Sequence, residues 1–101
     1  MKKTIVIGCD NAAVAMKEQL AAFIASLGYP VENMGCDSSD DPTTYPRVAE
    51  RVCEEIIASG YEKEGVLICG TGLGMAMCAN KFPGIRAGVC HDSFSGERLK
   101  L

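Results

Sequence analysis

Short apolar runs alternate with segments of helical periodicity along most of the chain. The apolar runs have the length of strands and occupy residues 3–8, 29–34, 66–69 and 85–90. The helical segments carry apolar residues three and four positions apart and occupy residues 12–27, 46–57 and 75–81. Strands that alternate with helices form a parallel sheet with right-handed crossovers. The pattern therefore predicts an α/β fold, a doubly wound parallel sheet with strand order 2-1-3-4.

The periodicity also predicts which side of each helix faces the core. In the first helix the apolar face consists of Met16, Leu20, Phe23, Ile24 and Leu27, and Lys17 belongs to the polar remainder. In the second helix the stripe is Val48, Ala49, Val52, Cys53, Ile56 and Ile57. Asp10 or Asn11 is expected to cap the first helix.

Composition narrows the class of protein. A chain of 101 residues with 48% hydrophobic residues suits one domain with one core. The net charge of −3, without a basic cluster, argues against nucleic-acid binding. No apolar run reaches the roughly 20 residues of a membrane span. The six cysteines form no C-x-x-C pair and only one histidine is present, which favours thiols in a reducing cytoplasm over a metal site.

A glycine-rich loop follows the third apolar run, with the sequence Cys-Gly-Thr-Gly-Leu-Gly over residues 69–74. Its glycine spacing is one residue short of the dinucleotide-binding fingerprint, and the lysine of a Walker A loop is absent. Glycines let several N–H groups approach a ligand, so this loop predicts an anion cradle with the Cys69 thiol at its edge. The plain alternative is a turn that reverses the chain, with Cys69 as a small core residue.

The predicted strand order places this loop beside a second one. Ligands of doubly wound sheets bind where the strand order reverses, here between the first and third strands. The loops that leave those strands are residues 9–11 and residues 69–74. The sequence therefore predicts one crevice formed by both loops.

Five motifs, in this order and spacing, resemble ribose-5-phosphate isomerase B and its galactose-6-phosphate isomerase relatives. They are Ile-Gly-Cys-Asp at 7–10, Tyr-Pro at 45–46, Ile-Cys-Gly-Thr-Gly-Leu-Gly-Met at 68–75, Ala-Asn-Lys-Phe-Pro-Gly-Ile-Arg-Ala at 79–87 and Cys-His-Asp at 90–92. The resemblance covers essentially the whole chain. It implies a Rossmann-like three-layer α/β/α fold and a homodimer or higher homo-oligomer. It also implies aldose–ketose isomerisation of a sugar phosphate without a metal ion or cofactor.

The resemblance also assigns roles to individual residues. Cys69 is implied to be the base that moves a proton between C1 and C2 through an enediolate, with Thr71 orienting it. A thiol acts as a base in its ionised form, which the N-terminal end of a helix stabilises. The implied substrate-binding residues are Asp10, Asn11, Tyr45, Gly70, Gly72, Leu73, Gly74 and His91. For His91 a capping or surface role is an equal alternative.

Three departures from the family pattern bear on these expectations. Asn11 stands where the family usually has histidine, and Ala13 where glycine is common. The family's ring-opening histidine, and its last strand and helix with phosphate-binding arginines, would follow Leu101. We therefore expect residues 1–101 to form a single, C-terminally incomplete isomerase-like domain.

Two other functions compete with the isomerase. One is a catalytically inactive phosphosugar-binding or regulatory module, which the departures favour. The other is a sugar-transport subunit that carries a phosphoryl group on Cys9.

Overall fold

A parallel sheet forms the centre of the structure, a computed structural model that describes residues 2–70 and 73–90. The elements in these ranges are β1 (Ile5–Cys9), α1 (Val14–Ser26), β2 (Val31–Asn33), α2 (Tyr45–Ala58), β3 (Glu64–Ile68) and α3 (Leu73–Ala79). The sheet order is β2-β1-β3, and both pairs are parallel. Ile5 is level with Val31 on one side and with Glu64 on the other. The order of these three strands is the predicted one.

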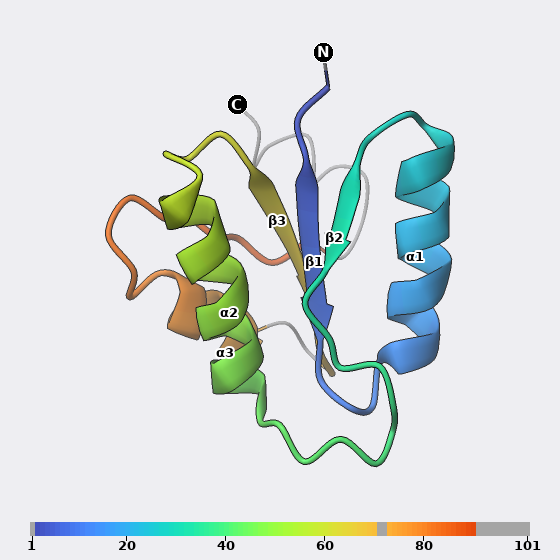
Figure 1. The fold of residues 1–101 in the computed structure, drawn as a ribbon. Coiled ribbons are helices and arrows are strands. Elements are labelled where there is room, and N and C mark those ends of the chain that lie inside the picture. The colour runs from blue at the N-terminus through green and yellow to red at the C-terminus, as the bar shows by residue number, and fades with distance from the viewer. Residues whose placement is uncertain (1, 71–72, 91–101) are drawn as a thin grey trace.

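The helices lie on two sides of the sheet, as Figure 1 shows. Helix α1 packs on β1 and β2, whereas α2 covers the other face over β1 and β3 and also contacts α3. Helices on both faces bury the central strand of a parallel sheet, which is why β1 reads as a continuous apolar run. The prediction of a three-layer α/β fold is confirmed.

The core lies between the sheet and α2. Val48, Ala49, Val52, Cys53 and Ile56 of α2 are all buried, as the periodicity of this helix predicted. Val48 and Val52 can approach β1 closely because Gly8 has no side chain. A Cβ added at Gly8 would lie 2.7 Å from Cγ1 of Val48 and 3.1 Å from Cγ2 of Val52.

Gly8→Ala is therefore expected to destabilise the fold. Overpacking of a tight core costs about 1–3 kcal/mol, and urea unfolding should show a loss in this range. Gly70→Ala is the matched control, because its new Cβ would meet no atom within 4 Å. Equal stability of the two variants would contradict this account of the α2–β1 contact.

The predicted inner face of α1 is wrong at Met16, Phe23 and Leu27, whereas Leu20 and Ile24 are partly buried as predicted. Met16, Phe23 and Leu27 are 61%, 59% and 47% exposed, and Lys17 is the one buried residue of this helix. The face toward the sheet is Val14, Lys17, Ala21 and Ile24, with Leu20 at its margin. The helix carries apolar residues on several sides, and the face that packs on the sheet is the one on which Lys17 makes its contacts.

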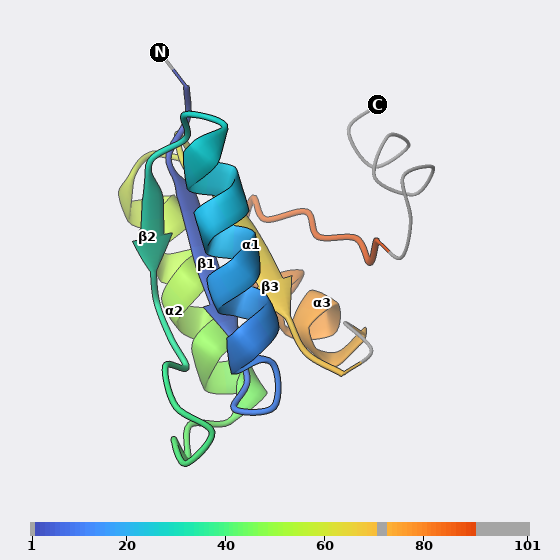
Figure 2. The same cartoon turned by 90° about the vertical axis from the view of Figure 1, so that its right-hand side faces the viewer.

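The predicted fourth strand at 85–90 is also absent from the structure. These residues form an irregular segment beyond α3 (Figure 2). The N–H of Ala87 donates to Oδ1 of Asn80 at 2.8 Å, and the carbonyl of Ala87 accepts from Nδ2 of Asn80 at 2.9 Å. The Asn80 amide therefore binds both peptide groups of Ala87, in the middle of the segment predicted as a strand. Ile85 nevertheless packs against the core of Val6, Val52 and Ile56.

The helices of the described ranges are all too short or too polar to cross a lipid bilayer.

Candidate active site

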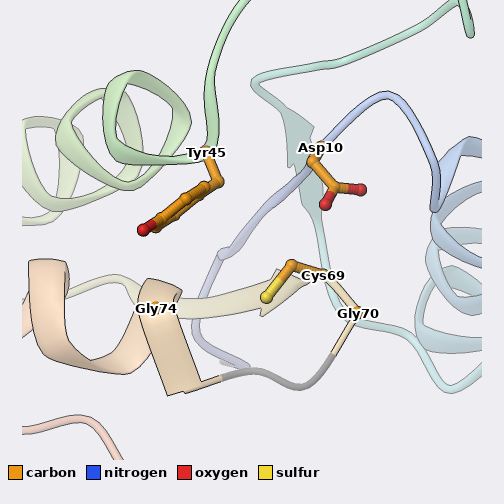
Figure 3. A pocket seen from close by; sticks show the side chains of 5 residues that line it. All are labelled: Asp10, Tyr45, Cys69, Gly70 and Gly74. Atoms are coloured by element: carbon orange, nitrogen blue, oxygen red, sulfur yellow. The ribbon is translucent and has the colours of Figure 1, made fainter.

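A pocket of about 300 Å³ opens where β1 and β3 end, at the predicted switch point of the sheet. Among the described residues it is lined by Asp10, Tyr45, Cys69, Gly70 and Gly74. Figure 3 shows the side chains of Tyr45, Asp10 and Cys69 around this space, each from a different segment of the chain. A second pocket, of about 400 Å³, lies on the α1 side of Cys69 and Gly70. Cys69 and Gly70 thus form a wall that the two pockets share.

The turn after β1 places the carboxylate of Asp10. Its Oδ1 atom accepts the N–H groups of Ala12 and Ala13, both at 3.1 Å. The N–H of Asp10 donates to the carbonyl of Ile68 at 3.2 Å, which fixes Asp10 beside the start of the glycine loop. Asp10 thus organises the turn before α1, whereas the N-cap position is occupied by Ala13 without a side-chain bond.

Tyr45 forms the opposite wall from the first position of α2. Its ring lies against Gly74 in the first turn of α3, where a Cβ would come within 2.6 Å of Cε1 of the ring. The missing side chain of Gly74 therefore lets the ring reach this position. At 43% exposure, the ring is in contact with solvent as well as with the pocket.

Cys69 differs from the cysteines of the core in its exposure. Cys9, Cys36 and Cys53 are buried, whereas Cys69 and Cys78 are half-buried and Cys90 is exposed. Burial raises the pKa of the thiols of Cys9, Cys36 and Cys53, so these three stay protonated near neutral pH. Cys9 is 0% exposed, which leaves no surface to receive a phosphoryl group and argues against the transport alternative.

This difference predicts the order in which the thiols react. With iodoacetamide at neutral pH, Cys69, Cys78 and Cys90 should be modified first, because alkylation needs an accessible thiolate. Cys9, Cys36 and Cys53 should react only after urea unfolds the chain. Peptide mass spectrometry over a time course measures both classes, and early labelling of Cys9 would contradict the burial described.

Some of the predicted site residues lie elsewhere or cannot be placed. Nδ2 of Asn11 donates to the carbonyl of Asp41 at 3.0 Å, so Asn11 joins the turn after β1 to the acidic loop before α2. Leu73 is exposed at the start of α3 and is not among the described residues that line the pocket. Thr71, Gly72 and His91 lie outside the described residues.

The sequence pattern did not predict the burial of Lys17, which lies outside the pocket. Lys17 is fully buried, and its ammonium group contacts the loop that follows β2. The only available signal was its spacing, because Lys17 falls on one helical face with Val14, Ala21 and Ile24. Within residues 2–70 and 73–90, no three His, Cys, Asp or Glu side chains are grouped to hold a metal ion.

Comparison with known proteins identifies the family. A family model described as Ribose/Galactose Isomerase matches residues 5–101. The ribose-5-P isomerase B of Listeria innocua is 40% identical over 96 residues, which are 95% of this chain and 64% of the relative. The D-erythrulose-4-phosphate isomerase of Pectobacterium atrosepticum is 37% identical over 97 residues, 96% of this chain and 63% of the relative.

A solved structure agrees with these sequence matches. The type B ribose 5-phosphate isomerase of Leishmania infantum superposes with a TM-score of 0.84 at 40% identity, over 94% of this chain and 62% of that one. The chain thus spans slightly less than two thirds of the length of these proteins. With the family model covering all but the first four residues, the chain belongs to the ribose/galactose isomerase family.

Proposed function

We propose that the protein is an aldose–ketose isomerase of a sugar phosphate, of the type that interconverts ribose 5-phosphate and ribulose 5-phosphate. The observation that carries the proposal is the pocket that groups a thiol, a carboxylate, a phenol and glycine backbone at the switch point. Membership of the family supports the reaction class, and relatives named for ribose and erythrulose phosphates support the substrate class.

In the proposed reaction Cys69 acts as the base. Its thiolate takes the proton from C2 of the open-chain aldose, and the electron pair of that C–H bond forms the C1=C2 double bond. The carbonyl π electrons move to O1, which gives the cis-enediolate. The proton then returns from the thiol to C1, while the O2 hydroxyl loses its proton and becomes the ketose carbonyl. As O2 loses its proton, the O1 oxyanion gains one and becomes a hydroxyl. The numbers of protons and electrons are thus unchanged, so no redox partner is needed.

Other groups around the pocket are proposed to stabilise the enediolate and hold the sugar. Backbone N–H groups of residues 70–74 are the proposed donors to the developing oxyanion, and preorganised donors of this kind contribute about 3–4 kcal/mol in enzymes. Oδ1 of Asp10 accepts two N–H groups, and Oδ2 is the proposed acceptor of a sugar hydroxyl. Tyr45 can donate its phenol to a second hydroxyl. Thr71, Asn11 and His91 keep the roles that the resemblance implies as proposals.

The proposal includes a homodimer or higher homo-oligomer in the cytoplasm. The six cysteines of the chain are all free thiols, which fits a reducing compartment. Light scattering coupled to size-exclusion chromatography measures the oligomeric state.

The test is incubation of the 101-residue protein with ribose 5-phosphate and an assay for ribulose 5-phosphate. Exchange of the C2 hydrogen in D₂O provides a second readout, because a base can wash out this hydrogen even when turnover is slow. Turnover or exchange supports the isomerase. Binding by calorimetry without either would establish the inactive sugar-phosphate-binding module instead. Parallel assays with erythrulose 4-phosphate and galactose 6-phosphate distinguish the substrates.

A further inference from the structure

Lys17 is a fully buried lysine that the proposed reaction does not use. It lies on the face of α1 toward the sheet, with 0% of its surface exposed. Its ammonium donates to the carbonyl of Cys36 at 2.6 Å, to Oδ1 of Asp37 at 2.6 Å and to Oδ1 of Asn33 at 3.0 Å. Three of its partners thus belong to residues 33–37, and Oε1 of Glu18 on α1 lies 3.2 Å from the same ammonium group.

The segment held by Lys17 is bonded to the end of β1. The N–H of Cys36 donates to the carbonyl of Cys9 at 2.8 Å, and the N–H of Cys9 donates to the carbonyl of Gly35 at 2.7 Å. The Cys36 carbonyl that accepts from Lys17 also accepts the thiol of Cys9 at 3.5 Å. Cys9 is followed in the chain by Asp10, which lines the pocket.

The same segment is bonded to the residues that precede Tyr45. The guanidinium of Arg51 donates to the carbonyl of Met34 at 3.2 Å and to Oγ1 of Thr43 at 3.4 Å. The thiol of Cys36 contacts the carbonyl of Thr43 at 3.9 Å. Thr43 lies two residues before Tyr45, at the entry to α2. Residues 33–37 are therefore connected to two walls of the pocket.

The charges around Lys17 keep its ammonium protonated. Burial lowers the pKa of a lysine, but the hydrogen bonds from Lys17 to Asp37 and Glu18 outweigh it and hold the pKa above the ordinary value. In turn, the hydrogen bonds from Lys17 and Asn33 lower the pKa of Asp37. A buried charge that loses its acceptors destabilises the fold, so the arrangement that supplies them is favoured.

We propose that Lys17 is a positioning residue for the pocket: by fixing residues 33–37 it sets Asp10 and Tyr45 on their two sides of Cys69. Lys17 acts through these residues and contacts neither the pocket nor the proposed substrate. The expected change in kcat/KM rests on the proposed function, whereas the effect of Lys17 on the positions of Asp10 and Tyr45 does not.

The experiment compares Lys17→Met with Lys63→Met. Lys63 is a matched control, because it also joins two carboxylates of different elements, Glu32 at 2.6 Å and Glu55 at 2.7 Å, but precedes β3 at the opposite end of the sheet. A urea unfolding curve of each variant identifies conditions under which both variants are folded. Amide hydrogen exchange at residues 9–13 and 43–47, and kcat and KM for ribose 5-phosphate, are then measured.

Lys17→Met should accelerate exchange at both segments by about tenfold or more and lower kcat/KM by about the same factor. Lys63→Met should leave both within about twofold at equal folded fraction. If exchange and kcat/KM of Lys17→Met match those of Lys63→Met, the proposal is overturned. If the wild type shows no turnover, the proposed function fails, and hydrogen exchange alone still decides the role of Lys17.

Asp37→Ala provides a second variant in case Lys17→Met does not fold. The Asp37 side chain is 70% exposed, so its removal spares the core while taking one acceptor from Lys17. Faster exchange at residues 9–13 and 43–47 supports the proposal. Unchanged exchange at both segments contradicts it.

Discussion

Replacement of Cys69 with alanine should abolish measurable isomerisation while the protein still binds sugar phosphate. A positioned general base contributes about 10²–10⁴-fold to a rate, so kcat should fall by at least that factor. The base acts on a C–H proton in the transition state and need not hold the substrate in the ground state. Stopped assays of ribulose 5-phosphate measure the first effect, and titration calorimetry measures the second.

The control for this variant is Cys78→Ala. Cys78 is also half-buried, and lies in α3, but it is not among the described residues that line the pocket. Its replacement should leave turnover within about twofold, because surface or half-buried changes away from a site have small effects. Turnover of Cys69→Ala within a few-fold of wild type would show that another group is the base.

Much of the fold could be predicted because β1, the central strand of the sheet, is buried between helices on the two faces. Continuous apolar runs such as Val66–Ile68 have few other stable environments, and the strand order then follows from right-handed crossovers. The position of the pocket follows from the same argument. Five of the predicted site residues, Asp10, Tyr45, Cys69, Gly70 and Gly74, do line one pocket. Their catalytic and binding roles stay predictions.

The orientation of α1 could not be predicted from hydrophobicity. The predicted stripe is Met16, Leu20, Phe23, Ile24 and Leu27. Leu20 and Ile24 also lie beside Val14 and Ala21 on the helix, so periodicity alone does not choose between the two sides. The side that faces the sheet is the one with Lys17, whose acceptors include groups on another part of the chain. In the sequence, a lysine on the buried side disagrees with the apolar pattern. Its burial is explained only by hydrogen-bond partners that the pattern does not reveal.

The prediction of a fourth strand was wrong for a related reason. Residues 85–90 are apolar enough for a strand, but the pattern contains no information on which group takes their backbone hydrogen bonds. The amide of Asn80 competes for the peptide groups of Ala87 and is close in sequence. Local side-chain bonds to backbone often replace regular structure in this way.

Gly74→Ala is expected to lower kcat/KM by about 10–100-fold with little effect on stability, because a misplacement of about 1 Å in a site can cost 10²-fold. The new Cβ would lie 2.6 Å from Cε1 and 2.9 Å from Cζ of Tyr45, so the ring must move out of the pocket wall. The ring is partly exposed and can rotate outward. Alanine also gains about 0.8–1 kcal/mol over glycine inside a helix, which offsets the lost contact. Steady-state kinetics and thermal unfolding measure the two effects.

A double-mutant cycle with Tyr45→Ala separates the ring from the loop. If Gly74→Ala acts by displacing the ring, it should cost nothing further in kcat/KM once the ring is gone, and it should then stabilise α3 through helix propensity alone. The two single variants would each be impaired, and the double variant would be no worse than Tyr45→Ala. An additive loss would instead place the effect in the backbone of residues 70–74. The cycle therefore decides whether Gly74→Ala acts through the space that Tyr45 occupies or through the backbone of residues 70–74.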